Sequence, residues 1–236
     1  MTDVEAVRTE IRLALPSKGR MAEEVIDLLS SAGLHVYKPN PRQYRATIPS
    51  LPGLTVLYQR SGDIITSVRD GSVDFGITGW DVFTERRAEN GSFVVLLNDL
   101  GFGQCTLNVI VPETWENVQT MPDLAAWQRQ MSRPIRIATK FPNLTEAFFQ
   151  ARGISDIQMI SAEGTLEIAP TIGYADLIVD LISTGTTLRD NRLKMLEDGL
   201  ILRSQACLIA NRQALKRRPE VLAMARQLLE FIVAHL

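Results

Sequence analysis

The 236-residue sequence has few of the residues that build disulfide frameworks and zinc centres. It contains two cysteines, Cys105 and Cys207, each in a separate apolar run, and two histidines, His35 and His235. Buried free thiols are therefore expected, and the four residues show no pattern typical of a zinc site. No Ser/His/Asp or Cys/His constellation for nucleophilic catalysis is visible either.

Long apolar runs and long blocks of one charge are missing as well. No apolar run reaches the roughly 18 residues of a membrane span, and the N-terminal MTDVEAVRTE lacks the apolar region of a signal peptide. The longest basic block is Lys216-Arg217-Arg218 and the net charge is −2, which gives no support for nucleic-acid binding. With 45% apolar and 22% charged residues, the sequence is typical of a soluble globular protein, which we expect in the cytoplasm.

The sequence is rich in apolar strands that alternate with amphipathic helices. Short strands are predicted over 11–15, 54–58, 75–79, 93–97, 135–139 and 157–160. This alternation predicts an α/β protein with mostly parallel sheets, and the strands are too many for one sheet of usual size. Two longer strands, 104–111 and 200–211, bracket the middle of the chain. We therefore predict two domains, 1–100 plus 190–236 and 101–189, with the ligand in the cleft between them.

The stretch with the most specific pattern is 175–191, ADLIVDLISTGTTLRDN. Its apolar strand holds Asp176 near the start and Asp180 near the end, and a turn rich in serine and threonine follows. Hydroxyls and free N–H groups at a helix N-terminus can bind an anion, and the preceding carboxylate can accept hydrogen bonds from a sugar. An ordinary capped turn is the alternative. The stretch resembles the phosphoribosyl-pyrophosphate (PRPP) loop of phosphoribosyltransferases, although Leu181 replaces the second acid found in many of them.

Basic residues follow the first predicted strand. Lys18 and Arg20 flank Gly19 in the turn after 11–15, at the strand end where open α/β sheets bind ligands. Solvated side chains are the alternative for either residue alone. Gly19 favours a ligand role, because glycine lets a ligand approach the backbone closely.

Six segments, in order along nearly the whole chain, together resemble the ATP phosphoribosyltransferase family. They are LPSKGRM (15–21), GSVDFGITGWDV (71–82), LGFGQC (100–105), RIATKFPNLT (136–145), GTLEIAP (164–170) and ADLIVDLISTGTTLRDN (175–191). The resemblance implies a two-domain fold of the periplasmic-binding-protein type with the active site in the interdomain cleft. It implies transfer of the phosphoribosyl group of PRPP to N1 of ATP, the first step of histidine biosynthesis, with Mg²⁺ as cofactor. Ser17 departs from the many members that have lysine directly after the proline.

The resemblance implies roles for individual residues. The residues expected to bind PRPP are Lys140, Glu167, Asp176, Asp180, Ser183, Thr184, Gly185, Thr186 and Thr187. Those expected to bind ATP are Lys18, Gly19, Arg20, Arg60, Asp63, Thr78, Gly79 and Asp81. Arg20, Arg42 and Asp180 are expected to carry catalysis, and Mg²⁺ to be held mainly by substrate phosphates. Structural or solvated roles stay open for Lys140, Arg42, Asp63, Asp81, Glu167 and Asp176.

The resemblance is to the short form of the family, because one strand and one helical segment follow Asn191. It implies a homodimer within a hetero-octamer, a regulatory subunit similar to histidyl-tRNA synthetase, and histidine as feedback inhibitor through that subunit. Leu222, Leu229 and Ile232 are candidate contact points, with core packing as their alternative. A non-catalytic solute-binding or ligand-sensing module is the competing interpretation. GSVDFGITG would suit such a module, whereas the 175–191 stretch does not.

Overall fold

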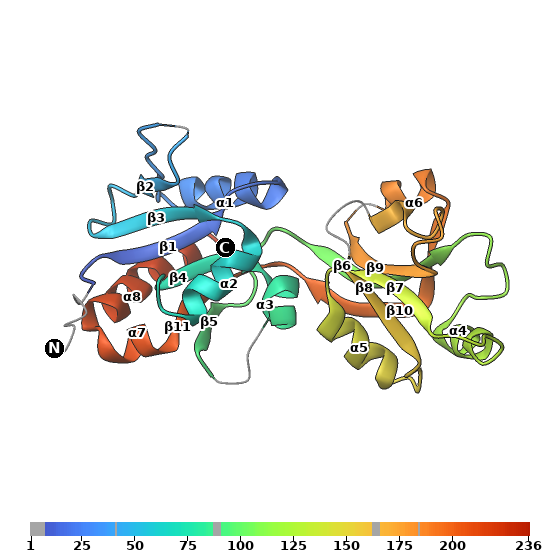
Figure 1. Ribbon diagram of the computed structural model, residues 1–236. Coiled ribbons are helices and arrows are strands. Elements are labelled where there is room, and N and C mark those ends of the chain that lie inside the picture. The colour runs from blue at the N-terminus through green and yellow to red at the C-terminus, as the bar shows by residue number, and fades with distance from the viewer. Residues whose placement is uncertain (1–7, 41, 87–90, 162–165, 184) are drawn as a thin grey trace. The chain divides into compact units, whose positions relative to one another are not determined.

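The computed structural model describes residues 8–40, 42–86, 91–161, 166–183 and 185–236 (Figure 1). The chain forms two compact units, one of Met1–Gly103 with Gln205–Leu236 and one of Gln104–Ser204. The sequence predicts that the chain returns to the first domain at residue 190, whereas residues 190–204 belong to the second unit. The reason is the long strand β10 (Leu193–Ser204), which pairs antiparallel with β6 (Cys105–Pro112).

The first unit is built on one six-stranded sheet (Figure 1). Its strands in spatial order are β2 (Arg45–Thr47), β3 (Leu54–Gln59), β1 (Ile11–Pro16), β4 (Phe75–Gly79), β11 (Ala206–Asn211) and β5 (Phe93–Leu97). β1 is parallel to β3 and β4, while β11 is antiparallel to β4 and β5. The carboxyl ends of β1, β3 and β4 therefore meet at one edge of the sheet, where ligands bind in open α/β folds.

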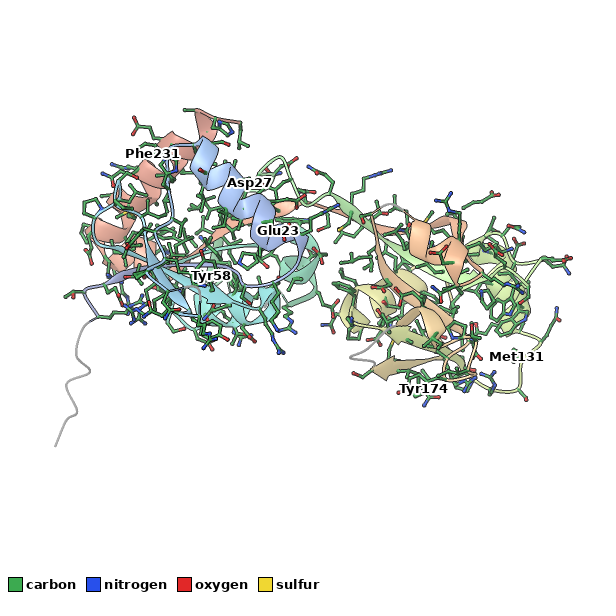
Figure 2. The ribbon with its side chains drawn as sticks, turned by 90° about the horizontal axis from the view of Figure 1, so that it is seen from above. Glu23, Asp27, Tyr58, Met131, Tyr174 and Phe231 are labelled. Carbon is green, nitrogen blue, oxygen red and sulfur yellow. The ribbon has the colours of Figure 1, made fainter. Side chains whose placement is uncertain are left out.

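Helices cover both faces of this sheet. They are α1 (Arg20–Ser31), α2 (Ser61–Arg69), α3 (Trp80–Arg86), α7 (Arg212–Arg217) and α8 (Pro219–Val233). Helix α1 buries Val25, Leu28 and Leu29 in an apolar cluster that it shares with α8. Glu23 and Asp27 lie on its exposed side (Figure 2). Helices α2 and α3 pack into a second cluster, and alternate residues of β11 enter the two clusters, so the clusters lie on opposite faces.

The second unit has a five-stranded sheet in the order β10, β6, β9 (Leu177–Ile182), β7 (Ile135–Thr139), β8 (Ile157–Ser161). β7 is parallel to β8 and β9, and β6 is antiparallel to β9 and β10. Helices α4 (Met121–Gln128) and α5 (Pro142–Gln150) pack on one face. The short helices η1 (Leu166–Ile168) and α6 (Thr186–Asp190) contribute to the cluster on the other face. The predicted α/β class is confirmed, but the sheets are mixed rather than mostly parallel: among the described strands, four pairs are parallel and five are antiparallel.

The apolar run 200–211, predicted as one strand, is two. Its first part ends β10 in the second unit, Gln205 lies outside both strands, and its second part is β11 in the first unit. Length and apolarity alone do not show where a chain leaves one sheet for another.

The two cysteines and the apolar residues of α8 are expected to be buried, and the structure shows this for some of them. Cys105 and Cys207 are free thiols, but Cys105 is only half-buried. Burial raises the pKa of Cys207 to about 12, and the charge of Asp81 adds to the rise. Ile232 is buried in the core, whereas Leu222 is 40% exposed. No helix in the described ranges is long and apolar enough to cross a membrane.

Candidate functional site

A small pocket of about 80 Å³ lies in the second unit at the carboxyl end of β9. Three of its polar lining residues, Glu167, Asp180 and Ser183, are ones that the sequence predicts to contact PRPP. The full lining is Ile110, Glu167, Ile178, Asp180, Leu181, Ile182, Ser183, Gly185 and Leu188. Three segments that are separate in sequence thus meet here: β6, η1, and the stretch from β9 through the following turn into α6.

Asp180 is the best-defined polar group of this pocket. It lies on β9 directly opposite Asn108 of β6, and its Oδ1 accepts a hydrogen bond from the Leu181 N–H at 2.8 Å. Burial raises the pKa of Asp180, and the negative charge of Glu167 raises it further. The Leu181 N–H and the charge of Lys140 act in the opposite direction. A partly desolvated carboxylate with one occupied oxygen can accept hydrogen bonds from a ligand hydroxyl.

The charges beside Asp180 come from two other elements. Glu167 lies in η1 and is half-buried, and Lys140 is exposed just beyond the end of β7. Because β7 and β9 are parallel neighbours, Lys140 and Asp180 lie at the same edge of the sheet. Two carboxylates and one ammonium group therefore surround the position where the sequence places a ribose.

The turn after β9 carries the predicted phosphate site. Gly185 has φ of 73°, a left-handed conformation that glycine adopts without steric cost, and Ser183 is exposed. Helix α6 begins at Thr186, two residues earlier than the sequence predicts, and spans only five residues. So short a helix has a weak dipole, which leaves the turn itself to supply donors. Thr184 lies outside the described residues, as do the side chains of Thr186 and Thr187.

Asp176 lies at the opposite end of β9 from Asp180. Its Oδ2 accepts hydrogen bonds from Arg133 at 2.6 Å and from the Arg136 backbone N–H at 2.9 Å. Its Oδ1 accepts from the guanidinium groups of the same two arginines at 2.8 and 2.9 Å. Burial alone would raise the pKa of Asp176, but these hydrogen bonds outweigh it and hold the pKa well below its usual range. This geometry favours the structural alternative for Asp176.

In the first unit, the turn after β1 holds Lys18, Gly19 and Arg20. Gly19 precedes α1 with φ of 77°, so a residue with a side chain would be strained there. Lys18 and Arg20 are exposed, and Arg20 Nε lies 3.3 Å from Glu24 Oε1. The Ser17 N–H donates to the Gln59 carbonyl at 2.8 Å, which holds this turn beside the end of β3.

Two further predicted segments follow the neighbouring strands. Arg60 is exposed and is the N-cap residue of α2, and Asp63 lies in the first turn of that helix. Thr78 and Gly79 end β4 and are buried, and Asp81 in α3 is 4% exposed. A Cβ on Gly79 would lie 2.2 Å from Asp81 Oδ1, so a residue with a side chain at this position would displace the Asp81 carboxylate.

Arg42 reaches the same edge of the first unit by another route. It lies in the loop before β2, and its N–H donates to Asn40 Oδ1 at 3.0 Å. Because β2 is antiparallel to β3, this loop lies beside the carboxyl end of β3, where the Tyr58 N–H donates to the Tyr44 carbonyl at 2.9 Å. A pocket of about 520 Å³ opens next to it, lined by Pro39, Gln43, Tyr44, Arg45, Ala46, Thr47 and Thr55.

The two carboxylates of the β9 pocket are candidate ligands for a metal ion. Glu167 and Asp180 are hard oxygen donors of the kind that Mg²⁺ accepts, and Mg²⁺ usually keeps several waters or phosphate oxygens besides. Across the described residues, no group of three or more His, Cys, Asp or Glu side chains could hold a metal ion. The pocket therefore fits a magnesium ion that takes most of its ligands from a bound phosphate.

Sequence reasoning missed Asn108. It is 5% exposed, lies on β6 directly opposite Asp180, and donates to Thr106 Oγ1 at 2.7 Å. A polar residue inside an apolar strand was the only signal, and the register of an antiparallel pair cannot be read from one strand. Asn108 brings a polar side chain to the face of the sheet that lines the pocket.

Comparisons with known proteins identify a family and several relatives of the chain. A family model described as HisG, ATP phosphoribosyltransferase, matches residues 60–232. ATP phosphoribosyltransferase 1, chloroplastic, of Arabidopsis thaliana is 43% identical over 232 residues, which are 97% of this chain and 56% of that protein. The chain thus spans little more than half the length of this plant relative.

Two solved structures bear on the fold. The ATP phosphoribosyl transferase (HisG:HisZ) complex from Thermotoga maritima matches with a TM-score of 0.73 and 25% identity, over 95% of this chain and 99% of that one. The periplasmic aliphatic sulphonate binding protein SsuA from Escherichia coli matches with a TM-score of 0.58 and 13% identity, over 97% and 72%. The second likeness shows the fold alone and confirms the predicted periplasmic-binding-protein-like class. The family model shows more: the chain belongs to the ATP phosphoribosyltransferase family.

Proposed function

We propose that the chain transfers the 5-phosphoribosyl group of PRPP to N1 of ATP, giving N1-(5-phosphoribosyl)-ATP and pyrophosphate. The observation that carries the proposal is the pocket at the end of β9, in a chain of this family. There Asp180, Glu167 and the turn of Ser183 and Gly185 line one pocket. The turn would hold the 5-phosphate, and Asp180 would accept hydrogen bonds from the ribose hydroxyls.

The chemistry needs little from the protein in the way of proton transfer. The lone pair of adenine N1 forms a bond to C1 of PRPP, while the bond from C1 to the pyrophosphate oxygen breaks and its electron pair leaves with pyrophosphate. Neutral N1 needs no general base, which fits a sequence without a histidine-centred constellation. Positive charge develops on the ribose and negative charge on the leaving group, so positioning and electrostatics would supply the catalysis.

The residues have separate parts in this scheme. Asp180 and Glu167 would face the developing positive charge of the ribose, and Lys140 would meet a phosphate at the edge of the sheet. Lys18, Arg20 and Arg42 of the first unit would stabilise the triphosphate of ATP or the departing pyrophosphate. Mg²⁺, when bound, would neutralise charge on the pyrophosphate oxygens.

We extend the proposal to assembly and location. The Thermotoga HisG chain, matched over 99% of its length, is in a complex with HisZ. A similar regulatory subunit, a homodimeric catalytic unit within a hetero-octamer, and feedback by histidine through the partner would suit this chain. The free thiols suit a reducing compartment such as the cytoplasm.

The test is to mix the purified chain with PRPP, ATP and Mg²⁺ and to measure pyrophosphate release together with phosphoribosyl-ATP. The two products should appear in equal amounts, and omission of ATP or PRPP should abolish both. The competing solute-binding module would bind a ligand without releasing pyrophosphate. Pyrophosphate release that depends on PRPP but not on ATP would instead indicate a different reaction and refute the proposed acceptor.

A further inference from the structure

Arg203 lies on the same face of the second sheet as the β9 pocket. In the register of β10 with β6, Arg203 is opposite Thr106, and in the register of β6 with β9, Thr106 is opposite Ile182. Residues directly opposite each other in antiparallel strands point to the same face. Ile182 lines the pocket, so Arg203, Thr106 and Ile182 form a row that leads across the sheet to it.

The neighbours of Arg203 support this orientation. Leu202 is opposite Leu107, and both pack into the apolar cluster on the face of α4 and α5. The next residue, Arg203, is opposite Thr106 and therefore points to the other face. Arg203 is exposed, and within the described residues its guanidinium has no recorded hydrogen bond or ion pair. Neighbouring strands are about 4.8 Å apart, which puts the Cα atoms of Arg203 and Ile182 about 10 Å apart. An extended arginine and a bound phosphate can together span that gap.

With a phosphate monoester bound, the charges of the pocket would sum to a negative value, which a further cation could offset. Glu167 and Asp180 contribute two carboxylates, and Lys140 on the β7 side offsets one of them. A phosphate monoester adds nearly two more negative charges at neutral pH. The turn of Ser183 and Gly185 offers neutral donors, and the Mg²⁺ of the proposed function would serve the pyrophosphate rather than the monoester.

We infer that Arg203 binds the phosphate monoester of the substrate, from the β10 side, while the turn before α6 binds it from the other. The inference rests on the proposed function, because it assigns a further specificity residue to the same site. A guanidinium suits this role, since its planar N–H groups can contact two phosphate oxygens at once. Thr106 joins the row to β9, because its hydroxyl donates to the Ile182 carbonyl at 3.4 Å.

The experiment compares ligand binding by the full-length chain and its Arg203→Gln, Arg203→Lys and Arg129→Gln variants. Calorimetry measures the affinity of each protein for ribose 5-phosphate, whose one phosphate group is a monoester, and then for inorganic pyrophosphate and for ATP. Arg203→Gln should weaken ribose 5-phosphate about 10- to 100-fold, the scale of a charged hydrogen bond, and leave ATP unchanged. Arg203→Lys keeps the positive charge but loses the planar pair of N–H donors, so its loss of affinity for ribose 5-phosphate should be smaller. Arg129 follows α4 in the same unit and is exposed, which makes it the matched control.

Each outcome decides the inference. Equal affinity of the wild type, Arg203→Gln and Arg129→Gln for ribose 5-phosphate would overturn it and leave Arg203 an ordinary surface residue. A loss confined to pyrophosphate would also overturn it, because the guanidinium would then serve the leaving group. Circular dichroism of each variant separates a binding loss from a folding loss. A wild-type chain that releases no pyrophosphate from PRPP and ATP would instead refute the proposed function, and the inference with it.

Discussion

Asp180 and Asp176 lie on the same strand, and their surroundings give them different chemistry. The hydrogen bonds of Arg133 and Arg136 occupy both oxygens of Asp176 and keep its pKa low. Within the part of the chain that the structure describes, the Leu181 N–H is the one donor to Asp180, and burial raises the pKa of Asp180. One carboxylate has its bonds satisfied by the protein, and the other has capacity left for a ligand. This difference motivates opposite predictions for the same substitution.

Asp180→Asn should lower activity without lowering stability. Loss of a charged hydrogen-bond acceptor to the ribose should cost about 1–3 kcal/mol of transition-state stabilisation, seen in kcat/KM for PRPP. Because the folded-state pKa is raised, ionisation of Asp180 disfavours the folded state at neutral pH, so the variant should unfold at equal or higher urea concentration. The wild-type kcat/KM should fall as pH drops through this raised pKa, and the variant should lack that fall. Wild-type PRPP kinetics in the variant would remove Asp180 from the site.

Asp176→Asn should lower stability and spare ligand affinity. Both arginines are partly exposed, so we expect a loss of about 1–3 kcal/mol in the free energy of unfolding at neutral pH. The depressed pKa means that this stabilisation is complete above the unfolded-state value near about 3.9 and disappears as pH falls through the folded-state value. The gap between wild type and variant should therefore narrow in acid. Urea unfolding at several pH values, followed through the stacked pair of Trp115 and Trp127 in the same unit, measures it.

A folded Asp176→Asn chain that no longer binds ribose 5-phosphate would contradict the structural role. The carboxylate would then act on the ligand, as the other interpretation of the sequence holds. Binding equal to wild type, with reduced stability, is the outcome that the ion pairs predict.

In both units, a buried aspartate with arginine partners precedes a central strand of the sheet. Asp74 precedes β4 and Asp176 precedes β9, and each accepts a backbone N–H from the neighbouring parallel strand, that of Arg12 at 2.8 Å or Arg136 at 2.9 Å. Each also pairs with two arginine side chains; those of Asp74 are Arg8 and Arg218. Both devices fix the amino ends of the strands and leave the carboxyl ends for the proposed ligands.

Much of this arrangement can be predicted from local patterns. The strand with Asp180, the turn after it, and the glycine turns after β1 and β4 follow from apolar runs and from Gly and hydroxyl residues at their ends. The antiparallel pairing of β6 and of β11 with their neighbours could not be predicted, because an apolar run has the same pattern in a parallel and an antiparallel position. For that reason the position of Asn108 and Arg203 near the pocket could not be predicted from the sequence. Their placement depends on register between distant strands.

The packing of α2 on β4 depends on Gly76. A Cβ there would lie 2.5 Å from Ile64 Cγ2 and 3.1 Å from Val68 Cγ2, both on buried side chains of α2. Gly76→Ala should force the helix away from the sheet and cost about 1–3 kcal/mol of unfolding free energy. In Gly62→Ala the new Cβ meets only the guanidinium of Arg86, which can move, so this control should change stability by less than about 0.5 kcal/mol. Equal melting temperatures for both variants would show that α2 does not constrain β4.

At the scale of the whole molecule, the proposed reaction divides its substrates between two units of separate construction. The candidate ATP residues gather at the carboxyl edge of the first sheet, and the candidate PRPP residues gather at the end of β9 in the second. A partner subunit can regulate such a chain only if it binds one conformation better than the others. Reciprocity then requires that a ligand favouring the same conformation also strengthens binding of the partner.

These conditions lead to a prediction about histidine. We expect histidine to leave the activity of the chain alone nearly unchanged, and to inhibit it once a HisZ-type subunit is added. A coupling free energy of about 1–3 kcal/mol is typical of such systems and corresponds to a change of about 5- to 150-fold in apparent affinity. The measurement is pyrophosphate release at rising histidine, with and without the partner, and the affinity of the partner with and without histidine. By linkage the two effects must agree in size. Strong inhibition of the chain alone would place the regulatory site within its own two units, and would show that no partner is needed to create it.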